Sequence, residues 1–288
     1  MSVSVAINTL NEEKNLPFAL RSVRSWVDEI VVVDMHSDDR TVRIAESFGA
    51  RVYTHERLGF ADPARAFAIS RTTGDWVLIL DADEVIPARL AARLSAIARG
   101  ESALDVVKIA RLNYLLGAPL RHTGWGPSSD YQKRFFRRGS LVATDTIHDF
   151  LKPAPGARTC RLPAEDGLAI VHFNYLDVSH FLDKLNRYTT IEAEQARRRG
   201  ERTSPLGGSV RAAREFLRRY VFARGYRDGW RGFYLSALMA LYRLSVSAKL
   251  TELSAGVSAQ SAEQLYAAAA ERILADYPET QKAGPAGD

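Results

Sequence analysis

Residues 74–84 of the 288-residue chain read GDWVLILDADE, an apolar run that ends directly in acidic residues. The run from Trp76 to Leu80 predicts a short β-strand that is buried on both faces, as strands inside a parallel sheet are. Asp81 and Asp83 follow this strand with one residue between them. Because ligands of open α/β sheets bind at the carboxyl ends of the strands, this position favours two functional carboxylates.

The rest of the first 110 residues alternates between strand and helix patterns. Short runs rich in apolar and β-branched residues, two of them (Ile30–Val33 and Trp76–Leu80) wholly apolar, predict the strands, and apolar residues at helical spacing predict the helices. The predicted strands are Val3–Ile7, Ile30–Val33, Arg51–Thr54, Trp76–Leu80 and Val106–Ile109, and the predicted helices are Leu16–Val27, Thr41–Phe48, Asp62–Arg71 and Pro87–Gly100. This alternation predicts an α/β fold with a mainly parallel central sheet flanked by helices.

The pattern changes beyond residue 110. Residues 111–130 are rich in Gly and Pro and predict a long loop, and two further strands are predicted at Tyr131–Phe136 and Ala169–Phe173. From Val178 onward the pattern is helical, with interruptions at Gly200, residues 205–208 and Gly225, and a polar tail begins near Glu279. The chain therefore divides into residues 1–110, 111–177, 178–278 and 279–288, and the third segment is predicted to be a C-terminal helical region.

The overall composition is that of a globular protein. Hydrophobic residues make up 46% and charged residues 25%, which excludes a disordered or a collagen-like chain. The single cysteine, Cys160, cannot form an intramolecular disulfide, as is typical of a reducing compartment. No signal peptide is visible, and the longest uncharged helical stretch, residues 232–242, is too short to span a bilayer. These features predict a cytoplasmic protein.

Positive charge is concentrated late in the chain. Residues 184–249 hold 15 Lys and Arg against 5 Asp and Glu, a balance of +10, whereas the remaining residues carry −5. The arginines flank apolar helical stretches such as 216–222 and 233–241, which is typical of a helical layer on an anionic membrane surface. A solvated basic face over an ordinary helical core explains the same pattern. Nucleic-acid binding is disfavoured, because no recognition module is present and the front of the chain is acidic.

Polar and acidic residues also follow the first two predicted strands. Thr9 and Glu12 come after the first strand, and Asp34 ends the second. Together with Asp81 and Asp83 they predict a sheet edge at which a divalent cation is held and neutralises phosphates. The other interpretation of such acids is a solvated turn that caps a helix. The chain lacks a glycine-rich phosphate loop, which argues against a Rossmann dehydrogenase and a P-loop ATPase.

Three blocks of sequence, in this order and at this spacing, carry a family resemblance. They are Val5–Glu13, Val32–Asp34 with Ser37–Thr41, and Gly74–Glu84. Together they resemble an inverting family 2 glycosyltransferase of GT-A fold, which is a Rossmann-like fold. The segments Gly124-Trp125, Asp130–Gln132 with Arg134–Gly139, and Lys184–Tyr188 are similar to the branch that contains the lipopolysaccharide core-biosynthesis glucosyltransferases. The resemblance covers roughly residues 2–250.

The resemblance implies a metal site and a nucleotide-sugar site. Asp81, Asp83 and His172 would bind the divalent cation, Mg²⁺ or Mn²⁺, with Asp83 as the more direct carboxylate ligand. Ala66 stands where this branch usually has an asparagine after the basic residue Arg65. The UDP-sugar donor would be bound by Thr9, Glu12, Asp34, Arg65, Asp81, Gly124 and Trp125.

The resemblance also implies a catalytic base. An inverting transfer needs one carboxylate that takes the proton of the acceptor hydroxyl. His148-Asp149 lies where the branch usually has His-Glu, which favours Asp149 as this base. Asp130 and Asp145 are nearby alternatives, and a solvated loop acid is the non-functional interpretation of each.

The resemblance implies a metal-dependent inverting glycosyltransferase that transfers a hexose, glucose from UDP-glucose, to a lipopolysaccharide-core or other surface-glycan or lipid-linked acceptor. Residues 1–110 would bind the nucleotide sugar, residues 111–177 would bind the acceptor, and the helical region would dock peripherally on the inner face of the cytoplasmic membrane. Two alternatives stay open: a sugar-phosphate nucleotidyltransferase and a non-catalytic basic peripheral membrane-binding protein. The former usually has a glycine-rich, basic segment where this chain has the acidic residues 9–13.

Overall fold

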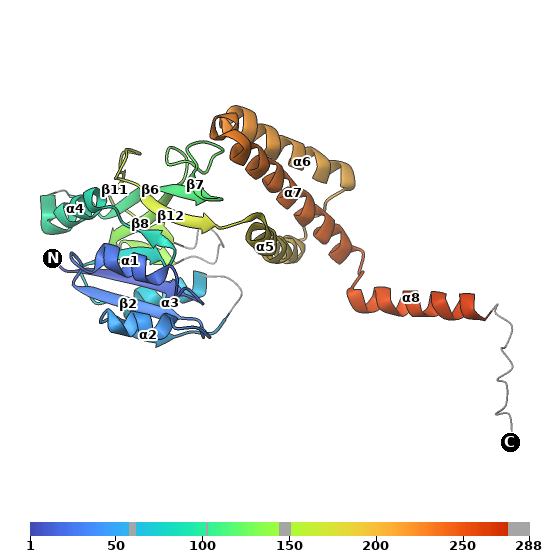
Figure 1. Ribbon diagram of the computed structural model, residues 1–288, viewed down its shortest axis with the longest axis horizontal. Coiled ribbons are helices and arrows are strands. Elements are labelled where there is room, and N and C mark those ends of the chain that lie inside the picture. The colour runs from blue at the N-terminus through green and yellow to red at the C-terminus, as the bar shows by residue number, and fades with distance from the viewer. Residues whose placement is uncertain (58–61, 102, 144–150, 276–288) are drawn as a thin grey trace, which may run out of the picture. The chain divides into compact units, whose positions relative to one another are not determined.

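One sheet organises the first 181 residues of the computed structural model, which describes residues 1–57, 62–101, 103–143 and 151–275 (Figure 1). The strand order is β3-β2-β1-β4-β8-β6-β12-β5, and β7 and β11 also pair with β6. Strands β3, β2, β1 and β4 are parallel, whereas β8 runs antiparallel between β4 and β6. The predicted α/β sheet flanked by helices is confirmed, with parallel pairing among the N-terminal strands and of β6 with β11 and β12.

The elements follow one another along the chain with these bounds. The strands are β1 Val3–Thr9, β2 Glu29–Asp34, β3 Arg51–Thr54, β4 Trp76–Asp81, β5 Glu84–Val85, β6 Val106–Leu115, β7 Ala118–Pro119, β8 Tyr131–Arg137, β9 Leu141–Ala143, β10 Leu151–Pro153, β11 Thr159–Arg161 and β12 Ile170–Tyr175. The helices are α1 Leu16–Val23, α2 Thr41–Ser47, α3 Asp62–Arg71, α4 Ala88–Ala96, α5 Val178–Arg198, α6 Pro205–Leu217, α7 Gly229–Ser254 and α8 Ala259–Leu274. Short helical turns lie at η1 Ile97–Glu101, η2 Arg218–Phe222 and η3 Gly225–Asp228.

The central strands are buried on both faces because helices cover both sides of the sheet. On one face the side chains of Val5 and Leu78 belong to a core that α1, α2 and α4 complete. On the other face Ala6 and Val77 pack with residues of α3. All seven residues of β1 are buried, including the polar residues Ser4, Asn8 and Thr9, as expected of a strand covered on both faces. This rigid centre fixes the carboxyl ends of β1, β2 and β4.

The loop predicted for residues 111–130 is wrong in its first part. Strand β6 continues to Leu115, and residues 111–115 pair in parallel with β12. That pairing satisfies the backbone hydrogen bonds that a loop would leave to water. The consequence is that Asn113 is buried inside the sheet, although its neighbours in sequence include turn-forming residues.

The chain forms two compact units, and the described part of the second comprises residues 182–216 and 237–275. Within this unit Glu192 accepts hydrogen bonds from the Tyr242 hydroxyl (2.7 Å) and from Arg243 (3.0 Å). The predicted interruption at Gly200 is confirmed, because α5 ends at Arg198. The interruption predicted at residues 205–208 is wrong: Pro205 begins α6, a position that proline tolerates. No helix in the described part of the chain is long and apolar enough to cross a membrane.

Candidate active site

The sheet brings polar residues from three strands to one edge. Thr9, the last residue of β1, is the register partner of Asp34 at the end of β2. Asn8 is the register partner of Asp81 at the end of β4 on the other side. Asp34 is buried and holds its own loop, accepting hydrogen bonds from the Ser37 amide (2.9 Å) and hydroxyl (2.5 Å). The predicted convergence of Thr9, Asp34 and Asp81 on one edge is therefore present.

Two buried polar atoms at this edge lack a hydrogen-bond partner among the described residues. They are Oδ1 of Asn8 and the hydroxyl oxygen of Thr9. Buried polar groups in proteins are nearly always hydrogen-bonded, so these atoms are suited to a ligand that donates to them. Glu12, in the same β1–α1 connection, accepts a hydrogen bond from Asn15 (2.8 Å), and its amide donates to Thr41 (2.8 Å).

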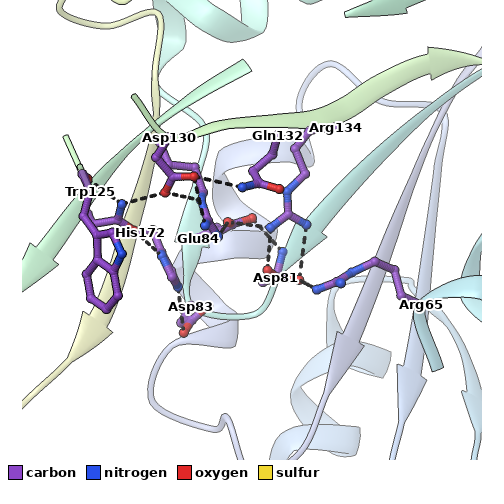
Figure 2. Close-up of polar contacts among 11 residues, drawn as sticks. Arg65, Asp81, Asp83, Glu84, Trp125, Asp130, Gln132, Arg134 and His172 are labelled. Carbon is purple, nitrogen blue, oxygen red and sulfur yellow. Dashed lines mark hydrogen bonds and ion pairs between the residues drawn. The ribbon is translucent and has the colours of Figure 1, made fainter. Parts of the chain in front are cut away.

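The Asp81 carboxylate forms ion pairs with two arginines, Arg65 and Arg134 (Figure 2). Its Oδ2 accepts from Arg134 at 2.6 Å, and its Oδ1 accepts from Arg65 at 2.7 Å. Burial raises the pKa of Asp81, but the charges of Arg134 and Arg65 outweigh burial and hold that pKa well below its ordinary value. Asp81 is therefore ionised at neutral pH and aligns Arg65 at the edge of the sheet.

Asp83 and His172 form a separate pair (Figure 2). Oδ2 of Asp83 lies 3.4 Å from Nε2 of His172, and the Asp83 carbonyl accepts from the Phe173 amide at 2.9 Å. Nδ1 of His172 lies 2.6 Å from Oδ1 of Asn113. The amide nitrogen of Asn113 donates to the Trp125 carbonyl (2.7 Å) and to Asp130 (2.8 Å), which turns its oxygen toward the imidazole.

This orientation of Asn113 selects the tautomer of the neutral His172 ring. An amide oxygen only accepts, so His172 donates from Nδ1, and in the neutral imidazole Nε2 keeps its lone pair. That lone pair and the Asp83 carboxylate then face one another. Two lone-pair donors at this separation, one nitrogen and one carboxylate oxygen, have the chemistry of a divalent cation site.

The charges around the pair are otherwise balanced. The carboxylates of Asp81, Glu84 and Asp130 are matched by the guanidinium groups of Arg65, Arg111 and Arg134. Asp83, by contrast, has no arginine or lysine partner in the part of the chain that the structure describes. Its carboxylate thus carries the uncompensated negative charge of the site, which a cation would neutralise.

Asp130 is engaged on all sides and is poorly suited to be the base. Its carboxylate accepts from Arg111 (3.0 Å), Asn113 (2.8 Å) and Gln132 (2.8 Å). Burial raises the pKa of Asp130, but the Arg111 charge and these hydrogen bonds together lower it by more. The net pKa therefore lies below the ordinary value. A carboxylate stabilised in its ionised form is a weak proton acceptor.

Gly124 and Trp125 lie in the connection between β7 and β8. Gly124 has a φ of 77°, a conformation that favours glycine. The Trp125 ring stacks on Tyr175 with 6.0 Å between centroids, and the Arg219 guanidinium lies 5.5 Å from the ring centroid. The backbone of this segment joins the polar network through the Trp125 carbonyl.

The structure brings together most of the predicted site residues, in two groups. Thr9, Asp34, Asp81 and Arg65 form one group, and Asp83, His172 and Trp125 form the other. No three His, Cys, Asp or Glu side chains within the described ranges are clustered closely enough to hold a metal on their own. A direct role for Asp81 as a metal ligand stays a prediction, as do the other site roles. Asp149, with His148 and Asp145, lies outside the described residues.

Three residues of the network were missed by the sequence analysis as site residues: Arg111, Asn113 and Arg134. Arg134 is buried and bridges Asp81 and Glu84. A signal for it was present, because Arg134 directly precedes the apolar pair Phe135-Phe136 in a predicted strand, and a charged residue that is buried there must be paired. Asn113 gave a similar signal. The polar residues Arg111 and Asn113 alternate with Leu112 and Tyr114, and this period of two is typical of a strand.

Residues 4–152 match the family described as glycosyl transferase family 2. The chain belongs to this family, and with the sheet described above this confirms the predicted GT-A fold class. The chain is thus a glycosyltransferase, which decides against the nucleotidyltransferase and the non-catalytic binding protein.

Similar proteins are found along nearly the full chain. An uncharacterized glycosyltransferase of Rickettsia typhi is 27% identical over 257 residues, covering 88% of this chain and 87% of that protein. The lipopolysaccharide core biosynthesis glycosyltransferase LpsC of Rhizobium meliloti is 25% identical over 260 residues, covering 87% of this chain and 92% of LpsC. Among solved structures, TarS of S. aureus has a TM-score of 0.46 at 19% identity, covering 80% of this chain and 46% of TarS.

Proposed function

We propose that this glycosyltransferase is metal-dependent and inverting, and that it transfers a hexose, glucose from UDP-glucose, to a lipid-linked precursor of a surface glycan such as the lipopolysaccharide core. The observation that carries the proposal is the pairing of Asp83 with His172: a carboxylate without an arginine or lysine partner among the described residues lies beside an imidazole nitrogen that, in the neutral ring, bears a lone pair. The likeness to LpsC supports the class of acceptor.

Asp83 and His172 would hold the divalent cation, Mg²⁺ or Mn²⁺, through one carboxylate oxygen and Nε2. The donor set fits such an ion, because Mg²⁺ and Mn²⁺ are commonly bound by few protein ligands together with phosphate oxygens. When bound, the cation would neutralise charge on the diphosphate of the departing nucleotide. Arg65, aligned by Asp81, supplies a second positive group on the same side of the sheet.

The nucleoside would bind where β1 and β2 end. Thr9 and Asn8 offer buried acceptors without a partner among the described residues, and the Asp34 carboxylate lies beside them. A uracil N–H and the ribose hydroxyls are donors of the kind these groups require. Glu12, Gly124 and Trp125 complete the proposed donor site, with Gly124 and Trp125 near the sugar.

The transfer itself needs one proton acceptor. The acceptor hydroxyl oxygen forms a bond to the anomeric carbon while the bond from that carbon to the diphosphate oxygen breaks, and its electron pair leaves with UDP. We assign the hydroxyl proton to Asp149, because the family resemblance sets His148-Asp149 where the branch has His-Glu. The low pKa of Asp130, which Arg111 and its hydrogen-bond donors maintain, makes that carboxylate a weaker proton acceptor. Attack from the side opposite the leaving group inverts the anomeric configuration.

The proposed acceptor implies where in the cell the enzyme works. A lipid-linked glycan precursor is presented at a membrane, so we propose that the enzyme works in the cytoplasm at the inner face of the cytoplasmic membrane. Nothing in this proposal requires nucleic acid.

A donor-hydrolysis screen tests the function. Purified protein is incubated with a panel of nucleotide sugars, with Mn²⁺, with Mg²⁺ and with a chelator, and the released nucleotide is measured. The proposal expects metal-dependent release of UDP from UDP-glucose above the other donors. Release that is unchanged by the chelator would contradict the metal dependence, and preference for another nucleotide would contradict the donor.

A further inference from the structure

Residues 217–236 expose an unusual number of large apolar side chains. This segment, which we call the arm, comprises the end of α6, the turns η2 and η3 and the start of α7, and it belongs to the same compact unit as the candidate active site. Phe222 is 79% exposed, and Tyr234 and Trp230 are each more than half exposed. The arm's exposed large apolar residues are Leu217, Val221, Phe222, Tyr226, Trp230, Phe233 and Tyr234.

Five aromatic residues of the arm form one connected cluster, and Phe222 lies outside these ring contacts. The ring of Tyr220 contacts Tyr226 and Phe233 edge-on, with centroids 6.3 and 5.6 Å apart. Phe233 contacts Tyr234, which in turn contacts Trp230. Scattered apolar residues are normal on a protein surface, but a contiguous exposed patch marks an interaction site.

The arm is also strongly basic. It contains five arginines and one aspartate, a balance of +4. The aspartate, Asp228, accepts hydrogen bonds from the backbone amides of Arg121 (3.0 Å) and His122 (2.9 Å). Arg224 and Arg227 are exposed, and neither side chain has an ion-pair partner among the described residues. Tyr and Trp side chains interleaved with arginines are typical of protein surfaces that lie at the headgroup level of anionic bilayers.

The arm is fastened to the segment that carries Trp125. The guanidinium of Arg219 is buried and donates to the Thr123 carbonyl at 2.9 Å. The Thr123 amide donates to the Ala223 carbonyl (3.1 Å), and Arg231 donates twice to the Leu116 carbonyl (2.9 and 3.1 Å). Gly232 packs so closely on the Gly225 carbonyl that a Cβ would lie 1.8 Å from its oxygen, so a side chain at this position is excluded. These contacts hold the exposed patch at a fixed place relative to the site.

We infer that the arm is the element of this enzyme that docks on an anionic lipid bilayer, with its aromatic cluster in the headgroup layer and Arg224 and Arg227 against lipid phosphates. The inference rests on the proposed function only in assigning a lipid-linked acceptor to that bilayer. A second copy of the chain fits less well, because two faces of charge +4 would then meet. Docking through the arm sets the distance between the bilayer and the Trp125 segment.

Vesicle flotation of the full chain tests this inference. Vesicles of phosphatidylcholine are compared with vesicles that also contain phosphatidylglycerol, at low and high salt. The wild type is expected to float with the anionic vesicles at low salt and to be released by salt. The double variant Arg224→Gln with Arg227→Gln is expected to weaken partition into the anionic vesicles about 30-fold, since each basic residue near such a surface strengthens binding roughly fivefold. Phe222→Ser, at the most exposed aromatic position of the arm, is expected to weaken it further.

Matched controls carry the same changes elsewhere. Arg21→Gln with Arg43→Gln and the single change Phe18→Ser alter exposed residues of α1 and α2 and are expected to float as the wild type does. All variants should hydrolyse soluble UDP-sugar at the wild-type rate, so a failure of the proposed function is seen in that assay and not in flotation. The inference is overturned if the wild type does not float or if the arm variants float as well as the wild type does. It is also overturned if light scattering shows that the wild type is a dimer and the arm variants are monomers.

Discussion

His172 and Asn113 are register partners on the neighbouring parallel strands β12 and β6, and the His172 Nδ1 atom lies 2.6 Å from the Asn113 Oδ1 atom. The sheet therefore fixes both the tautomer and the direction of the imidazole, and Nε2 faces Asp83. Groups that orient a metal-binding histidine in this way strengthen the affinity of the site, although they do not touch the metal.

Asn113→Ala is expected to lower Mn²⁺ affinity about 10- to 100-fold, because His172 then loses the acceptor that orients it. The measurement is a calorimetric or electron-paramagnetic-resonance titration of Mn²⁺ in the presence of UDP. Gln132→Ala is the matched control: it removes another donor to Asp130 (2.8 Å) and leaves His172 untouched. Equal losses in the two variants would show that Asn113 acts only through Asp130.

Asp81 is expected to stabilise the fold mainly above about pH 4. Burial raises its pKa, but Arg134 and Arg65 lower it more, so the folded-state pKa lies below the unfolded one. The stabilisation is complete above the unfolded value and is lost as the pH falls through the folded value. Asp81→Asn leaves the buried Arg134 with Glu84 alone, which should lower the free energy of unfolding at pH 7 by roughly 3 kcal/mol.

Urea unfolding between pH 7 and pH 3 measures this effect. The difference between wild type and Asp81→Asn should stay constant from pH 7 to about 5 and narrow below about pH 4. Asp38→Asn, which alters an exposed carboxylate paired with Arg57, is expected to change stability much less. A difference that does not narrow in acid would contradict the ionised, arginine-bound state of Asp81.

Thr9→Val is expected to weaken UDP binding without lowering the stability of the fold. The Thr9 hydroxyl is buried without a partner among the described residues, so replacing it by a methyl group should leave the free energy of unfolding unchanged or higher. UDP affinity should fall about 3- to 10-fold if this hydroxyl binds the nucleoside. Thr41→Val is the control, since its hydroxyl accepts the Glu12 amide at 2.8 Å and its loss should cost about 1 kcal/mol of stability. UDP binding by Thr9→Val at wild-type strength would remove Thr9 from the donor site.

Asp149→Asn is expected to lower the transfer rate about 10²- to 10⁴-fold while UDP affinity stays the same, because the change removes proton acceptance alone. Single-turnover transfer and UDP titration measure the two quantities. Asp145→Asn, a nearby carboxylate in the sequence, should transfer normally. Should Asp145→Asn lose the rate instead, the base would be Asp145.

The parallel half of the sheet was predictable because its signals are local. Each of β1, β2 and β4 is a mainly apolar, buried strand that ends in a polar or acidic residue, and parallel strands with short crossovers place their carboxyl ends on one edge. The meeting of Thr9, Asp34 and Asp81 followed from that rule. The family resemblance, which rests on the same blocks, was confirmed by the match over residues 4–152.

The second half of the site depends on pairings distant in sequence. Strand β8 enters antiparallel beside β4, and this brings Arg134 to Asp81, 53 residues away. Asn113 meets His172 across 59 residues, only because β6 continues through a segment rich in turn formers. The sequence marks Arg134 and Asn113 as polar residues within strands, but it does not show which residue each one meets, because strand order decides that. The split between an arginine-bound Asp81 and a metal-suited Asp83 could not be read from the spacing of the two acids.

Calorimetric titration of UDP, with and without Mn²⁺, into the wild type and Asp83→Asn tests the central claim most directly. Asp83 has no arginine or lysine partner among the described residues and contacts only the His172 imidazole as an ionisable neighbour, so its amide variant should fold with nearly wild-type stability. We predict that Mn²⁺ strengthens UDP binding by the wild type at least tenfold and has little effect on Asp83→Asn. Equal UDP affinity of the wild type with and without Mn²⁺, or an Asp83→Asn variant that responds to Mn²⁺ fully, would contradict it.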